Sequence, residues 1–210
     1  MNKKIVIPVV IVGIILAVWF LFFNKKKPQI TDDRLQAITV SKHTDVFNKS
    51  LNPVMTTYFV LTTGFVNWDT TAVGKASQEL KTALDSLKIS EIQKDTAIYE
   101  SALGPLDNIK TELAGLMGET TIEKKREDFN MVSQNLYDFL RTIRYDESKL
   151  YFQECPMAFD DEKPGNWLSK EVESNNPYLG TKHPKYGASM LSCGEPKDTL
   201  NFMTADTLKK

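Results

Sequence analysis

The stretch of sequence that decides the fold is residues 47–65, FNKSLNPVMTTYFVLTTGF. Its apolar side chains recur at three- and four-residue spacing, which places them on one face of an α-helix. They are Phe47, Leu51, Val54, Met55, Tyr58, Leu61 and Phe65. A helix with one apolar face is not stable alone, so this stretch needs partner helices. Nothing in it indicates a pocket.

Three later stretches repeat this periodicity and supply the partners. They are residues 76–87, 98–116 and 129–143. Ser90 with Gln93, and Thr120 with Glu123, have the spacing of capping boxes, so they indicate where the third and fourth helices begin. The pair Gly104–Pro105 predicts a bend in the third helix. Four apolar faces packed together predict a four-helix bundle in an all-α chain.

Composition and charge exclude several classes of function. The chain has 210 residues, 41% of them hydrophobic, which is enough for one packed core. The 26 basic and 27 acidic side chains nearly balance, so we expect no nucleic-acid partner. Residues 123–128 are all charged and are predicted to be solvated helix surface. No Gly-rich phosphate loop, Ser-His-Asp order or metal-hydrolase motif is present, so we expect no enzymatic activity.

The sequence of the N-terminal part predicts a membrane anchor. Residues 5–23, IVIPVVIVGIILAVWFLFF, carry no charge and would span about 30 Å as a helix, the thickness of a bilayer's hydrocarbon core. A cleaved signal peptide and a buried core helix are the alternatives, but the bulky end of the stretch and the lysines after it favour an uncleaved transmembrane helix. We therefore predict a flank at residues 1–4, an anchor in the lipid bilayer at 5–23 and a linker at 24–42.

The C-terminal part has a different character. Residues 151–201 are dense in Pro, Gly, Asn, Trp and Tyr and lose the helical periodicity. A structureless stretch of this length is unusual in a compact domain, so we expect it to pack on the bundle as an irregular segment. The predicted domain covers residues 43–205, with this segment at 150–205 and a tail at 206–210.

Both cysteines lie in this segment, and each has a methionine near it. Cys155 precedes Met157, Met190 precedes Cys193, and His183 lies between the two pairs. Thiolate and thioether sulfurs are soft ligands that suit Cu(I). The four sulfurs, with His183 as an optional ligand, therefore predict a site for Cu(I) or another soft metal ion.

Other interpretations of the same residues stay open. In an oxidising compartment, Cys155 and Cys193 are natural disulfide partners, and closing a loop of this length would contribute about 3–4 kcal/mol. The two methionines could fill gaps in the core, and the cysteines could be unpaired structural thiols.

Four blocks in this segment resemble the signature of a known family, the domain of unknown function 3347. They are Tyr151 with Cys155–Ala158, Asn166–Ser169, Asn175–Gly180 and Met190–Gly194. The resemblance extends over residues 45–205. It implies a helical bundle in the periplasm and, by association with adaptor subunits of heavy-metal efflux pumps, a role in metal handling. The stretch 181–186, which contains His183, lengthens a loop relative to the family's pattern.

These observations give two hypotheses. The first is a single-pass membrane protein with a periplasmic domain that binds copper or silver and supports metal efflux, with efflux components as partners. The second is a protein-interaction module of the cell envelope in which a Cys155–Cys193 disulfide is structural.

Overall fold

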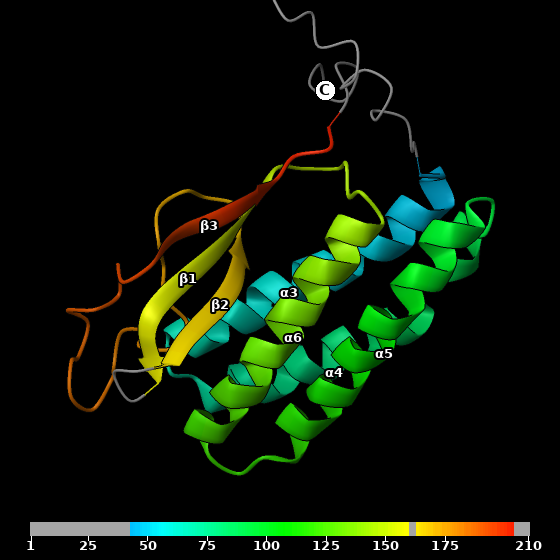
Figure 1. The fold of residues 1–210 in the computed structure, drawn as a ribbon. Helices are drawn as coiled ribbons and strands as arrows, with labels where there is room; N and C mark the ends of the chain where they lie inside the picture. The colour runs from blue at the N-terminus through cyan, green and yellow to red at the C-terminus, as the bar shows by residue number, and fades with distance from the viewer. Residues whose placement is uncertain (1–42, 160–162, 204–210) are drawn as a thin grey trace, which may run out of the picture. The chain divides into compact units, whose positions relative to one another are not determined.

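The structure is a computed structural model that describes residues 43–159 and 163–203. All of these described residues belong to one compact unit. Figure 1 shows its helices and strands. In chain order they are α3 (Asp45–Val66), α4 (Thr70–Ser86), the 3-10 turn η1 (Ile89–Ile92), α5 (Thr96–Gly118), α6 (Ile122–Thr142), β1 (Leu150–Phe159), β2 (Lys163–Ser169) and β3 (Glu195–Leu200).

Each of the four α-helices begins after a side chain that accepts a hydrogen bond from a backbone N–H of the first turn, which stabilises a helix start. The capping residues are Thr44, Asp69, Asp95 and Thr121. The predicted starts were therefore misplaced for two helices. Ser90 lies in the 3-10 turn instead, and Thr121 takes the place predicted for Thr120.

The core of the bundle is the one that the periodicity predicts. All seven apolar residues of the first stretch are buried in α3, and α5 continues as a helix through Pro105. The helices also bury their predicted apolar faces against one another. The largest fully buried side chains include Tyr58, Phe47, Phe65, Phe129 and Phe139.

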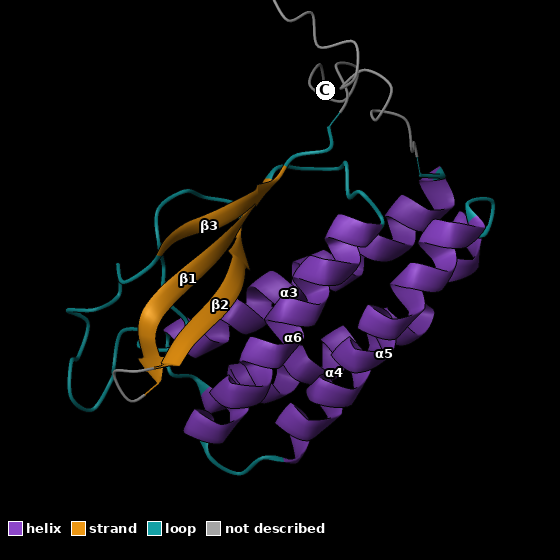
Figure 2. Cartoon of the chain, in the orientation of Figure 1, coloured by secondary structure: helices purple, strands orange, loops and turns teal. Residues whose placement is uncertain are grey.

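The prediction of an all-α chain is wrong, because the C-terminal segment forms a sheet. Three antiparallel strands lie in the order β2-β1-β3 (Figure 2). The sequence concealed them for two reasons. Neighbouring residues Phe152 and Gln153 of β1 are both buried, so the strand lacks a strict apolar–polar alternation. In β3, five of the six residues are exposed, and Glu195, Pro196 and Asp198 are types that strands disfavour.

The predicted membrane helix also needs correction. Among residues 43–159 and 163–203, no helix is both long enough and apolar enough to cross a bilayer. The predicted anchor itself, residues 5–23, lies outside the described residues. The prediction of a single-pass membrane protein therefore finds no support in the residues that the structure describes.

The sheet is attached to the bundle through the outer edge of β2. The backbone N–H of Leu168 donates to the hydroxyl of Tyr58 at 3.0 Å, and the N–H of Asn166 donates to Asn130 Oδ1 at 2.8 Å. Tyr58 is on α3 and Asn130 is on α6. The Tyr58 hydroxyl also shares a hydrogen bond of 2.8 Å with Ser133 Oγ. Helix side chains therefore satisfy donors of a buried edge that would otherwise need another strand.

Alkaline pH should weaken this attachment. Burial raises the pKa of Tyr58 from 10.0 to about 12, and hydrogen bonds to Leu168 and Ser133 oppose the shift. Burial also raises the pKa of Tyr178. Because the folded state holds these protons more tightly than the unfolded state, the stability they contribute is complete below pH 10 and is lost as the pH rises through the folded pKa.

We therefore expect the free energy of unfolding, measured with urea, to fall between about pH 9 and about pH 11. Tyr58→Phe should lower stability at both pH values, by about 1–3 kcal/mol, because Leu168 N–H and Ser133 lose a buried partner. Its further fall with pH should be smaller than that of the wild type. An equal fall in both proteins would contradict the role assigned to Tyr58.

Candidate functional site

The two cysteines are joined. A disulfide links Cys155 in β1 to Cys193, 38 residues later, with the Cα atoms 5.5 Å apart. Cys155 is fully buried and Cys193 is partly buried. In this form neither sulfur is a thiolate, so the disulfide that the sequence left as an alternative is the state that the structure contains.

The other predicted metal ligands have structural surroundings. Met157 and Met190 are partly buried and pack against the core. His183 Nδ1 accepts hydrogen bonds from the backbone N–H groups of Lys185 and Tyr186, at 3.2 and 3.3 Å. The His183 ring also stacks on the ring of Tyr186, with the centroids 4.9 Å apart.

Across the described part of the chain, no three His, Cys, Asp or Glu side chains gather in a group that could hold a metal ion. This finding corrects the expectation of a preformed metal site in the disulfide-bonded domain, for the residues that the structure describes. Cu(I) binding by Cys155, Met157, Met190, Cys193 and His183 stays a prediction that the structure does not test.

Hydrogen bonds of Asn176 connect the sequence blocks at 175–180 and 190–194. Its Oδ1 accepts hydrogen bonds from the N–H groups of Tyr178 and Leu179, at 2.7 and 2.9 Å. Its Nδ2 donates to the carbonyl oxygen of Cys193 at 2.8 Å, and its backbone N–H donates to Leu191 at 2.9 Å. Asn176 is fully buried, so each of these bonds forms away from water.

Aromatic side chains complete this packing. The ring of Tyr178 meets that of Trp167 edge-on at 5.9 Å, and its hydroxyl donates to the carbonyl oxygen of Asn166. A Cβ at Gly194, where φ is +133°, would lie 2.6 Å from the Trp167 ring. Residues from the blocks at 166–169, 175–180 and 190–194 therefore pack on one another, and their chemistry is that of a folded interior.

The segment meets the bundle at the end of α3. The N–H of Thr181 donates to the carbonyl oxygen of Val66 at 2.8 Å, and Trp68 Nε1–H donates to that of Leu179 at 2.9 Å. Gly180 allows this close approach, because its φ is +57° and a Cβ there would lie 2.5 Å from Val66 O.

Arg126 spans the same junction from α6. Its Nε donates to the carbonyl oxygen of Pro177 and its Nη2 to that of Phe65, both at 2.9 Å. The guanidinium lies 3.8 Å from the centroid of the Trp68 ring, a cation–π contact. Only 3% of Arg126 is exposed, and burial lowers its pKa from 12.5 to about 10, against the attraction of Glu123.

The prediction that residues 123–128 are solvated surface is therefore wrong at Arg126. The signal was present in the spacing. Arg126 is four residues after Ile122 and three before Phe129, and both of these are buried. Position 126 thus lies on the apolar face of α6, where a long side chain can extend to carbonyl groups across the core boundary.

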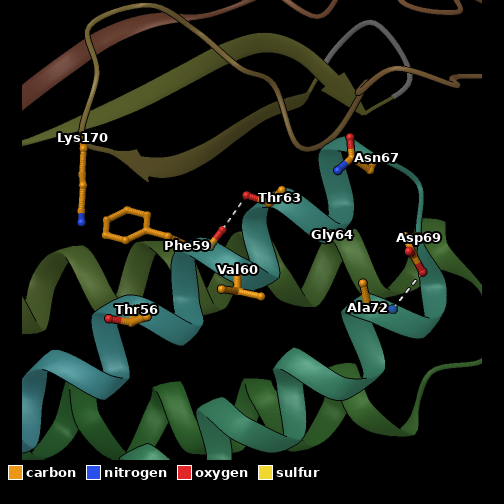
Figure 3. Close-up of a pocket in the computed structure, with 9 residues that line it drawn as sticks. All are labelled: Thr56, Phe59, Val60, Thr63, Gly64, Asn67, Asp69, Ala72 and Lys170. Atoms are coloured by element: carbon orange, nitrogen blue, oxygen red, sulfur yellow. Dashed lines mark hydrogen bonds between the residues drawn. The ribbon is translucent and has the colours of Figure 1, made fainter.

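A groove lies along the outer face of α3, where the sequence indicated no pocket (Figure 3). Its volume is about 400 Å³. We define the α3 groove by Thr56, Phe59, Val60, Thr63, Ala72 and Lys170, which line it. Val60 is 48% exposed, and Lys170 Nζ lies 4.9 Å from the centroid of the Phe59 ring. Lys170 follows β2, so the C-terminal segment contributes one side chain to the wall of the groove.

Comparison with known families identifies the helical part. Residues 54–148 match the model of a family described as "Protein of unknown function (DUF3347)". Over these residues the chain matches the DUF3347 family. The match begins within α3 and ends before β1, so the blocks at 155–158 and 190–194 lie outside it. No curated protein and no solved structure matches the chain. The association with efflux adaptors stays a prediction.

Removal of the disulfide should destabilise the protein. For the double variant Cys155→Ser with Cys193→Ser, we expect a loss of about 4 kcal/mol in the free energy of unfolding, because the unfolded chain regains the freedom of a closed loop. Urea denaturation with and without a reducing agent measures it. Reduction should lower the wild type to about the stability of the variant and leave the variant unchanged. A wild type that is insensitive to reduction would contradict the structural role.

Arg126→Lys should be destabilising although it keeps the positive charge. An ammonium group cannot reproduce the planar fork that donates to Phe65 and Pro177 and stacks on Trp68. We expect a loss of about 1–3 kcal/mol in urea denaturation, because two buried carbonyl groups lose strong donors. Arg141→Lys, at an exposed position of the same helix, is the matched control and should change stability by less than about 0.5 kcal/mol. Equal effects would show that the junction does not depend on Arg126.

Proposed function

We propose that this domain is a protein-interaction module of the cell envelope. The Cys155–Cys193 disulfide holds its C-terminal segment in place, and the α3 groove is its binding surface. The observation that carries the proposal is the contrast between the two regions. Signature side chains of the segment are engaged with one another, whereas the groove exposes apolar surface to solvent.

The engaged side chains support a structural role for the segment. Both cysteines are consumed by the disulfide. Asn176 uses both side-chain atoms in hydrogen bonds, and Tyr178 and Trp167 are buried against each other. Side chains that are bonded to one another in this way fix the shape of the domain. A fixed shape favours binding of a partner, because less of the surface has to become ordered on binding.

The wall of the groove is held in position before any partner arrives. Leu168, two residues before Lys170, is hydrogen-bonded to Tyr58 of α3. On the other side, the carbonyl oxygens of Glu171 and Val172 accept hydrogen bonds from Gln153 Nε2, at 3.2 and 2.9 Å. Binding there would order little additional backbone, which favours affinity.

The disulfide also agrees with the proposed compartment. Structural disulfides form and persist in oxidising surroundings such as the bacterial periplasm, and they are rare where glutathione and thioredoxin keep thiols reduced. A module with a disulfide in its core fits the cell envelope for this reason.

Site-specific photo-crosslinking in living cells tests the proposal. A photoreactive amino acid in place of Val60 should give an adduct with one and the same second protein in repeated experiments. The matched control is the same substitution at Met131, which is 40% exposed on α6 and does not line the groove. Adducts of equal yield at both positions, or none at Val60, would reject the groove as the binding surface.

A further inference from the structure

The side chains that line the α3 groove indicate which kind of partner would bind there. Phe59 and Val60 from α3 and Ala72 from α4 give its lining an apolar part, and the Phe59 ring points towards Lys170 (Figure 3). Thr56 and Thr63 continue the lining along α3. An occupant therefore needs apolar side chains along one face.

Lys170 places a positive charge at one end of the α3 groove. Lys170 Nζ lies over the Phe59 ring and forms no ion pair with a carboxylate among residues 43–159 and 163–203. At the opposite end, Asp69 Oδ1 accepts the N–H of Ala72 at 2.9 Å, so its charge already faces the positive end of α4. A carboxylate on the occupant would complement Lys170.

The backbone around the groove favours a helix as the occupant. Thr56, Val60 and Thr63 of α3 and its C-cap residue Asn67 have the spacing i, i+4, i+7 and i+11. They form a row of short side chains into which the ridge of another helix can pack. Strand addition is disfavoured at the exposed strand β3. Pro196 has no amide hydrogen there, and the N–H of Thr199 donates to Asp198 Oδ1 at 2.7 Å.

We propose that the α3 groove binds an amphipathic helix of a partner protein, with apolar side chains against Phe59, Val60 and Ala72 and an acidic side chain paired with Lys170. This inference rests on the proposed function and adds the chemistry of the partner. It is the helix-in-groove mode of recognition, in which anchors at three- and four-residue spacing supply affinity and charges at the rim set the choice of partner.

A pair of matched peptides tests the proposal. The first is an alanine-based helix of about 15 residues with three leucines on one face and a glutamate one turn beyond them, and the second has lysine in place of the glutamate. Both carry a dye and are titrated with the full chain, with fluorescence anisotropy as the readout. The glutamate peptide should bind about three- to ten-fold more tightly, since the exchange replaces an ion pair with a repulsion.

Two variants place the binding in the groove. Lys170→Glu should reverse the preference between the peptides, and Val60→Asp should abolish the binding of both. Both positions are exposed, and circular dichroism should confirm that each variant folds. An unchanged preference in Lys170→Glu, or no binding of either peptide up to about 1 mM, overturns the proposal.

Other occupants give different results. Self-association that Val60→Asp abolishes would assign the groove to a second copy of the chain. Binding to phosphatidylglycerol vesicles that Val60→Asp abolishes, with no binding of either peptide, would assign the groove to lipid. Either result overturns the inference. An adduct at Val60 in cells without any charge preference in the titration would reject the acidic helix and leave the interaction module standing.

Discussion

The backbone of β2 hydrogen-bonds to two helix side chains, and this contact holds the sheet on the bundle. A buried strand edge must find acceptors for its N–H groups, and Tyr58 and Asn130 provide them. Tyr58 can do so because its ring is fully buried in the bundle while its hydroxyl reaches the surface of the core. The sheet thus rests on the helices through directional bonds as well as apolar contact.

Arg126 extends the same principle to irregular chain. Arg126 donates to a carbonyl group at the end of α3, that of Phe65, which also accepts the N–H of Trp68, and to the carbonyl group of Pro177 in a loop. The geometry places a charged side chain inside the domain that forms no ion pair among the described residues, although Glu123 attracts it. Stacking on Trp68 and the two carbonyl dipoles take the place of an ion pair.

The sequence predicted the parts of this structure that follow a simple period. Residues 47–65 were placed correctly on one buried helix face, because contact with the core imposes the 3.6-residue repeat. The sheet escaped prediction because β1 is covered on both sides and β3 is largely charged. The hydrogen-bond partners of Arg126 and Tyr58 could not be predicted, because tertiary geometry sets the partner of a polar atom and a one-dimensional pattern does not record it.

The sequence alone also could not decide the chemical state of the two cysteines. Soft-ligand chemistry and disulfide chemistry both suit Cys155 and Cys193, and only their separation in space distinguishes the bonded state. The bond encloses the chain from β1 through β2 and past the turn at Asn176. A protease that cuts once anywhere between the two sulfurs therefore releases no fragment. The two pieces of the cut chain remain covalently linked through the disulfide. β3, which begins two residues after Cys193, therefore remains joined to the rest of its sheet.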